Sequence, residues 1–255
     1  MIERLIAVAQ NTFRQTLRER LFLNIIIFGV FMILLAMVLA NITFGYPDRV
    51  VRSIGLSGIS IAANLIALLV GVALVHQEID RKTLFVVLTR PVRRWEYAVG
   101  RYLGLMTTIA LSLVGLGLIF GFTLIVVRGE LLLGDVLAIG MCWFEAAVIA
   151  GVAISLSAFS TPTLSAGIGL GIWLASATTD DLLRLTQMAG GMPHQVAKGV
   201  YYLLPSLSRF NFREAVIYQQ QIDSADYLAA CAYGLIYSCF LLVLASVILS
   251  RREMV

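Results

Sequence analysis

Long apolar runs, separated by short polar stretches, dominate this sequence. Six runs are long enough, at roughly 20 residues each, to cross the hydrocarbon core of a bilayer as helices. They are Leu21–Ala40, Gly55–Val75, Tyr102–Val127, Val136–Phe159, Thr161–Thr179 and Leu228–Ser250, of which the fifth is the shortest and is rich in Gly, Ser and Thr. The alternation typical of barrel strands is absent from the sequence. The pattern predicts an all-α membrane protein with six transmembrane helices in a single domain, residues 1–255.

A shorter pattern with helical periodicity, Met1–Arg20, precedes the first run. One helix face holds Ile2, Leu5, Ile6, Ala9 and Phe13, and the other holds Arg4, Asn11, Arg14, Gln15 and Arg18. A short basic helix of this kind lies flat in the headgroup layer, where its Arg side chains meet anionic lipid. We therefore expect an interfacial helix that either only anchors the first span or also forms a surface for a cytoplasmic partner.

The composition narrows the class of protein. The chain is 60% hydrophobic and 13% charged, with a mean hydropathy of +0.91; an average soluble domain has roughly twice that charged fraction. These values exclude a disordered chain, a disulfide scaffold and a water-soluble enzyme. Because Cys142, Cys231 and Cys239 all lie in apolar runs, we expect packed side chains there, without disulfides or metal ligands.

The basic residues predict the orientation. Six spans place both termini, and the loops after the second and fourth spans, on one side, which then holds twelve of the 19 Lys and Arg residues. Cytoplasmic loops carry an excess of Lys and Arg, so we expect both termini in the cytoplasm. The same bias accounts for the net charge of +4 without a nucleic-acid partner.

The loop between the second and third spans, His76–Arg101, has a pattern of its own. Leu84 and Leu88 lie one helical turn apart, and Pro91 must end that helix because it lacks an N–H and clashes with the preceding turn. A short amphipathic helix between Glu78 and Pro91 is more than a soluble loop requires. The pattern therefore predicts a docking element.

Two segments resemble a known family. The spacing of Glu78, Thr83–Leu84, Leu88, Pro91, Arg94 and Gly100–Arg101 resembles the corresponding loop of type-2 ABC exporter permeases, the six-span subunits of ATP-driven exporters. Asn11–Arg14 resembles the basic amphipathic helix that precedes the first span in that family. The resemblance implies a permease dimer in a bacterial or archaeal cytoplasmic membrane, with a coupling helix around Arg81–Thr89 inserted into a separate cytoplasmic ABC ATPase subunit.

The resemblance also assigns roles to single residues. The ATPase-coupling positions it implies are Glu78, Arg81, Thr83, Leu84, Phe85, Leu88, Pro91 and Arg94, and the interfacial-helix positions are Arg4, Phe13, Arg14 and Arg18. ATP and Mg²⁺ would be bound by the partner ATPase, and no cofactor by this chain. A periplasmic or lipoprotein component is left open, and the substrate is equally well a lipid, an amphiphile, a hydrophobic peptide or a drug-like molecule.

The last external loop, Asp180–Tyr227, contains a second apolar stretch, Val200–Pro205. Similar permeases carry short re-entrant helices here that close the translocation path, which makes Leu203, Leu204 and Pro205 candidates for an external gate. Non-helical backbone at membrane depth is tolerated only where protein or a water-filled cavity covers it. The alternative is a cap outside the membrane that does not gate.

Catalytic chemistry is not apparent in the sequence. Lys82–Thr83 superficially matches the end of a phosphate-binding loop, but Arg81 precedes it and His76 stands at the first glycine position, so the chain is not expected to be its own ATPase. The only histidines, His76 and His194, fall on opposite sides of the membrane in the predicted topology, which disfavours an intramembrane metal or serine hydrolase.

Glu145 is the one ionisable side chain well inside a predicted span. A charge there is costly, so such a residue is a functional hypothesis by default. It could be protonated, pair with an Arg, contact substrate, or only fix packing by bonding to Ser or Thr of the fifth span. An ion-driven secondary transporter is the main alternative function, although no second acid lies at similar depth and no inverted repeat is visible.

Three pairs of glycines, each four residues apart, fall in the predicted spans or at their ends: Gly100 and Gly104, Gly117 and Gly121, and Gly167 and Gly171. This spacing lets helix backbones approach closely. It predicts tight helix packing without identifying the partner of each helix.

Overall fold

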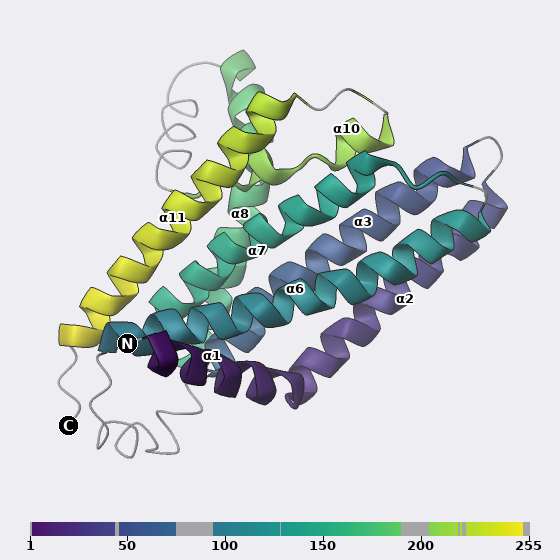
Figure 1. The fold of residues 1–255 in the computed structure, drawn as a ribbon. Helices are drawn as coiled ribbons and strands as arrows, with labels where there is room; N and C mark the ends of the chain where they lie inside the picture. The colour runs from purple at the N-terminus through teal and green to yellow at the C-terminus, as the bar shows by residue number, and fades with distance from the viewer. Residues whose placement is uncertain are drawn as a thin grey trace.

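The computed structural model describes residues 2–43, 46–74, 94–127, 129–189, 204–218, 220 and 223–251. These residues form helices joined by short connections, with no strand among them (Figure 1). The elements are α1 (Ile2–Leu17), α2 (Arg20–Ile42), α3 (Pro47–Leu65), η1 (Ile66–Val70), α6 (Arg94–Val126), α7 (Leu133–Ser157), α8 (Pro162–Ala189), η2 (Leu207–Phe210), α10 (Arg213–Ile217) and α11 (Ser224–Arg251).

Five of the described helices are long and apolar enough to cross a membrane: Arg20–Ile42, Pro47–Leu74, Trp95–Val126, Leu133–Ser157 and Ser224–Ile248. They overlap the first, second, third, fourth and sixth predicted spans. The prediction of an all-helical fold is confirmed for the described residues, and five such apolar helices are what a multi-pass membrane protein requires. The fifth predicted segment forms α8, which is long but is not among the five. Its Gly, Ser and Thr residues lower its hydropathy.

Two helices begin or end away from the predicted boundaries. The helix expected to start at Gly55 already starts at Pro47, which brings Arg52 from the expected loop into α3. The segment expected to end at Thr179 continues in α8 to Ala189, so the external loop was predicted to start too early. Hydropathy misses both extensions because charged or polar residues occupy these helix turns.

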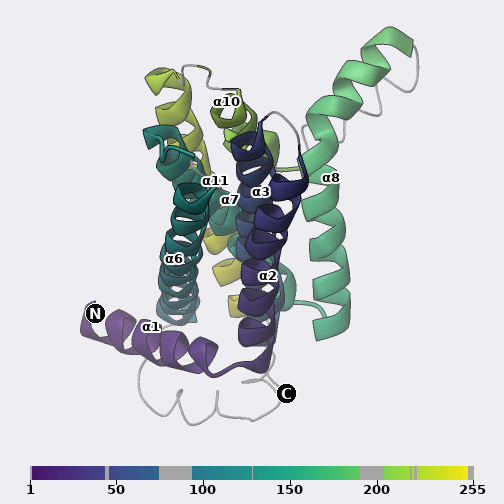
Figure 2. The same ribbon diagram turned by 90° about the vertical axis from the view of Figure 1, so that its right-hand side faces the viewer.

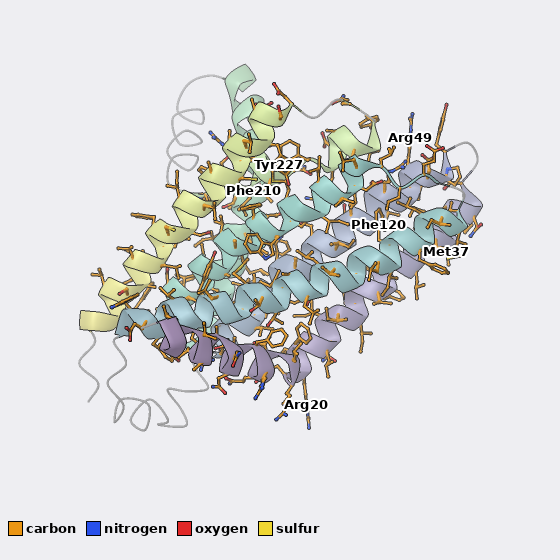
Figure 3. All side chains as sticks on the ribbon, viewed as in Figure 1. Arg20, Met37, Arg49, Phe120, Phe210 and Tyr227 are labelled. Carbon is orange, nitrogen blue, oxygen red and sulfur yellow. The ribbon has the colours of Figure 1, made fainter. Side chains whose placement is uncertain are left out.

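The helices form a bundle with two helices at its centre. The most apolar stretch of each helix is buried to different extents. It is 72% buried in the helix Pro47–Leu74, which contains α3 and η1, and also in α7, but only 28% buried in α2, 39% in α6 and 22% in α11. The outer helices turn large apolar side chains outward, such as Phe31, Leu118 and Phe240. Figure 3 shows this outward layer of side chains on the bundle. An apolar outer surface is what lipid contact requires, because hydrocarbon solvates it as well as a protein core does.

The two ends of the bundle are different. We call the end with α1 and Arg20 the foot, and the opposite end, where α3 and α11 begin, the head (Figures 1 and 3). Figure 2 shows α1 lying crosswise at the foot, below the ends of α2 and α6. The C-terminal end of α11 lies at the foot as well.

Glycines determine how α1 meets α6. A Cβ atom on Gly104 would lie 2.5 Å from the Thr12 Cβ and 2.6 Å from the Ala9 carbonyl oxygen, and one on Gly100 would lie 2.7 Å from Val8. The Thr12 hydroxyl is satisfied within α1, donating to the Val8 carbonyl at 2.9 Å. The first predicted glycine pair, Gly100 and Gly104, therefore forms the surface of α6 against which α1 packs. Small residues permit this close approach of the two helices.

We expect Gly104→Leu to displace α1 from α6, because the new side chain would overlap backbone atoms that cannot rotate away. Overpacking of this kind costs about 1–3 kcal/mol. The measurement is maleimide labelling of a Thr12→Cys chain in vesicles: the buried cysteine should react slowly, and at least several-fold faster when Gly104→Leu is added. Gly115→Leu is the matched control, since a Cβ at Gly115 meets nothing within 4 Å. Equal labelling of both double variants would contradict this packing of α1 against α6.

Candidate functional site

A fully buried arginine lies at the head of the bundle. Arg52 on α3 is 1% exposed. Its guanidinium donates to Asp48 Oδ2 at 2.9 Å, to Asp135 Oδ1 at 3.2 Å and to the Glu130 carbonyl oxygen at 2.6 Å. Three acceptors from three segments thus neutralise and orient one cation. A buried charge needs this degree of pairing to be tolerated.

Local sequence places these groups. Pro47 stands in the first turn of α3, where its missing N–H costs nothing, and Asp48 follows it, one helical turn before Arg52. Asp135 lies in the first turn of α7, and its Oδ2 accepts the Leu132 N–H at 2.9 Å. One carboxylate therefore caps α7 and pairs with α3. The cluster ties the start of α3 to the connection between α6 and α7.

A second polar cluster lies deep in the bundle around Glu145, on α7. Glu145 is buried, and its two oxygens accept hydrogen bonds from Ser60 Oγ at 3.0 Å and Asn64 Nδ2 at 2.9 Å. Both donors come from α3, the second predicted span. Ser or Thr of the fifth span was expected to bond to Glu145, but these two hydrogen bonds come from α3 instead. Trp173 of α8 and Arg213 of α10 also interact with the Glu145 carboxyl group.

The Glu145 cluster borders an irregular stretch of helix. Directly after Asn64 and Leu65, α3 widens into the π-helix η1. Leu68 of η1 meets Gly169 of α8 so closely that a Cβ on the glycine would overlap it. π-helical turns inside α-helices are frequent at functional sites. Asn64 is fully buried, and its Oδ1 has no hydrogen-bond partner within the described part of the chain.

A third polar cluster lies at the foot, where α1 meets α6. Arg101 is 2% exposed, donates to Gln15 Oε1 at 3.1 Å and to the Tyr97 hydroxyl at 3.2 Å, and lies over the Tyr97 ring. Arg101 was expected among the basic residues of this side, and the structure buries it against α1 instead of leaving it in solvent. The cluster links α1 to the start of α6.

The candidates for an external gate are described only in part. Leu203 lies outside the described residues, whereas Leu204 is half-buried and Pro205 is buried. The segment that follows folds onto the bundle, because the Ser206 N–H donates to the Tyr233 hydroxyl at 3.0 Å and Leu207 and Phe210 are buried. This part of the loop packs against α7 and α8, which agrees with either a gate or a cap.

Most of the coupling positions fall in a segment that the structure does not describe. Outside the described residues lie Glu78, Arg81, Thr83, Leu84, Phe85, Leu88 and Pro91, together with His76 and His194. The backbone is described again from Arg94, the first residue of α6. On α1, the backbone of Arg4 is helical, Arg14 is exposed and Phe13 is half-buried, and Arg18, in the turn directly after α1, is exposed.

Among the described residues, no three His, Cys, Asp or Glu side chains gather where they could hold a metal ion. The three cysteines are free: Cys142 is buried on α7, Cys231 is half-buried and Cys239 is exposed, so the expectation of packed side chains does not hold for Cys239. The structure thus offers polar clusters inside a helical bundle and several close interhelical contacts at glycines. Compared with protein-family models and with curated proteins, the chain matches none.

Proposed function

We propose that this chain is the transmembrane permease subunit of an ABC exporter and works as a dimer with a separate cytoplasmic ATPase. The observation that carries the proposal is the arrangement at the foot. There α1 lies crosswise against α6, at the end of the bundle where the helical continuation of α3 and η1 is last described, at Leu74, and where α6 begins, at Arg94 (Figure 2). The segment between them, on which most of the predicted coupling positions fall, therefore starts and ends at the foot.

The proposal includes six spans. The helix α7 ends at the foot and α11 begins at the head, so the chain crosses the bundle between Ser157 and Ser224 (Figures 1 and 2). The helix α8 starts at the foot and has 28 residues, about 42 Å at 1.5 Å per residue, which exceeds the roughly 30 Å of a hydrocarbon core. We infer that α8 is the fifth span of six. With the excess of basic residues at the foot, both termini are then cytoplasmic.

In this function the clusters have different tasks. Closure of the ATPase pair on ATP would push the coupling segment. Through the contact between α1 and α6, it would also move the ends of the spans at the foot. The Arg52 cluster would hold the heads of α3 and α7 together, so that the movement is transmitted along rigid helices. The Glu145 cluster would keep α3 and α7 in register at mid-span. A cavity between two copies suits a lipid, an amphiphile, a hydrophobic peptide or a drug-like molecule.

The test is substitution of the coupling positions. The chain is tagged and purified with the ATPase subunit that accompanies it from its native membrane. We expect Leu84→Asp with Leu88→Asp to abolish co-purification, or to lower the permease-stimulated ATP turnover at least tenfold, because two carboxylates cannot enter an apolar groove on the ATPase.

Tyr218→Asp is the matched control, since this exposed tyrosine lies in the segment that folds over the head. It should leave both the complex and its turnover unchanged. Full assembly and full turnover in the Leu84 and Leu88 variant would remove the basis for an ATPase partner at this segment.

A further inference from the structure

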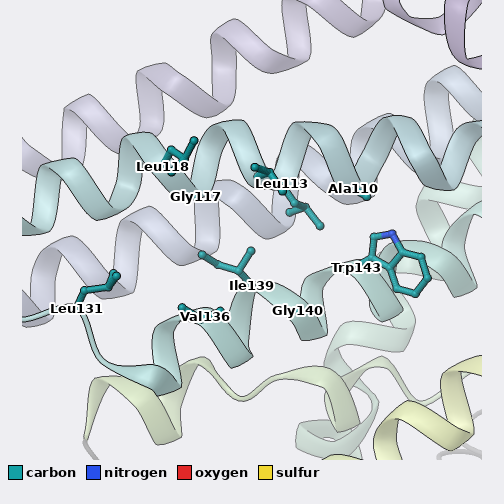
Figure 4. A pocket seen from close by; sticks show the side chains of 10 residues that line it. Ala110, Leu113, Gly117, Leu118, Leu131, Val136, Ile139, Gly140 and Trp143 are labelled. Atoms are coloured by element: carbon teal, nitrogen blue, oxygen red, sulfur yellow. The ribbon is translucent and has the colours of Figure 1, made fainter.

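An apolar groove runs between α6 and α7 on the outside of the bundle (Figure 4). It has a volume of about 550 Å³. Gly117 on α6 widens it, because a Cβ at this position would already lie 3.3 Å from Ile139 of α7. Leu118 and Val136, which also line it, are 71% and 54% exposed. The groove therefore opens sideways, toward the surroundings of two membrane-spanning helices.

The walls of the groove offer almost no polar group. Trp143 closes one end, and its ring N–H is already used, donating to the Met106 carbonyl oxygen at 3.3 Å. Leu131 and Val136 line the other end. A ligand that relies on hydrogen bonds would find no partner here. Hydrocarbon would match these walls without leaving a polar atom unpaired.

The size of the groove decides between a hydrocarbon chain and a helix. Along α6 it extends from Ala110 to Leu118, about 12 Å at 1.5 Å per residue. A volume of about 550 Å³ over that length corresponds to a cross-section of about 45 Å². A helix of 10 Å diameter has a cross-section of about 80 Å². A helix from a partner or from a second copy could therefore cover the open side without filling the groove, whereas an acyl chain can lie inside it.

A polar pocket lies beside the Leu131 end of the groove. Leu131 lines the groove, and its neighbours Glu130 and Leu132 line a separate pocket of about 290 Å³ with Asp48 and Arg52. The change from apolar to polar lining thus takes place within three consecutive residues at the head of the bundle. An amphiphile changes from chain to headgroup over a similarly short distance.

We propose that this groove binds one acyl chain of a membrane phospholipid, with the headgroup at the level of the Glu130–Leu132 connection. The ligand class follows from the apolar walls, the narrow cross-section and the polar pocket at one end. The inference goes beyond the proposed function, because it needs only a membrane around the bundle and no ATPase. It adds a lipid site on the outer face of the α6–α7 pair.

The experiment uses Trp143 as the reporter. The full chain with Trp95→Phe and Trp173→Phe keeps a single tryptophan, at the end of the groove. It is purified in detergent and titrated with phosphatidylcholine brominated in its acyl chains, which quenches tryptophan fluorescence on contact. We expect quenching that saturates at about one lipid per chain.

Gly117→Phe should weaken this binding by about tenfold or more, because a ring in the groove displaces several methylene groups and each buried methylene is worth roughly fourfold in affinity. Val136→Phe fills the groove from α7 at an exposed position and is the second variant should Gly117→Phe fail to fold. Gly115→Phe is the control, since this exposed glycine on α6 faces open space, and it should bind as the parent chain does.

Three outcomes would overturn the proposal. One is no quenching of Trp143 at any lipid concentration. Another is quenching that rises without saturation and equally in the Gly117→Phe and Gly115→Phe chains, which would indicate general lipid contact. The third is a dimer, measured by its mass in detergent, that Gly117→Phe dissociates, since a second copy would then be the occupant of the groove.

Discussion

Replacement of Arg52 by methionine is expected to lower the free energy of unfolding by about 3–5 kcal/mol, among the largest effects of any single change in this chain. Methionine fills a similar volume, so the loss arises mainly from the groups left behind. Asp135 is fully buried and would lose its cation, keeping only the Leu132 N–H as a partner, and the Glu130 carbonyl would lose its donor. Removing one partner of a buried ion pair destabilises a protein more than replacing both partners by apolar residues.

The measurement is unfolding of the purified chain in mixed micelles, followed by circular dichroism as SDS is added. Arg49→Met is the matched control: Arg49 is on the same helix, one turn earlier, and lies exposed over the Tyr46 ring. Its loss should cost no more than about 1 kcal/mol. The double variant Arg52→Met with Asp135→Leu should recover part of the stability. If Arg52→Met costs no more than Arg49→Met, the cluster does not hold the head of the bundle.

The spans themselves could be predicted because one physical quantity determines them. A helix that crosses lipid must be apolar over roughly 20 residues, whichever neighbours it packs against. Leu21–Ala40 and Leu228–Ser250 accordingly match α2 and α11 to within a few residues. The prediction was weakest for α8, whose small and hydroxyl residues can be read equally as a span or as a loop.

The buried arginine could not be placed by the same reasoning. Arg52 was expected on the external side, in the loop after the first span, because a charge normally ends an apolar run. Its burial depends on Asp135, which is 83 residues away in sequence. Hydropathy treats every position separately, so it cannot see that two opposite charges meet and neutralise each other. Pro47 and Asp48, which together are a typical helix start, were the local signal that α3 begins earlier.

The partners of Glu145 illustrate the same limit at mid-span. The sequence singles out Glu145 correctly as a buried acid, but Ser60 and Asn64 were missed. They lie four residues apart within one apolar run, so they share a helix face. That spacing was a readable signal of a polar stripe on α3. The position of that stripe against α7 is tertiary information, and it does not follow from the spacing.

Glu145 is expected to tolerate glutamine and not alanine. Glutamine keeps a carbonyl oxygen that can accept from Asn64 Nδ2, and its NH₂ group can donate to Ser60 Oγ or to Asn64 Oδ1, which has no other partner among the described residues. Glutamine also gives up the attraction to Arg213, but this cation is only half-buried and stays hydrated, so we expect Glu145→Gln to change the free energy of unfolding by no more than about 1 kcal/mol. Alanine removes both acceptors and leaves a cavity, so Glu145→Ala should cost about 3–5 kcal/mol.

Both variants are compared in the same SDS titration, with Cys142→Ala as the control, because Cys142 is buried one turn earlier on α7. That change should cost about 1 kcal/mol. A large loss for Glu145→Gln as well would show that the carboxylate charge, and not its hydrogen bonds, stabilises the contact between α3 and α7. Transport separates the remaining alternatives: an ATP-driven permease that needs Glu145 for packing keeps its activity in Glu145→Gln, whereas an ion-driven transporter that titrates this group loses it with the fold intact.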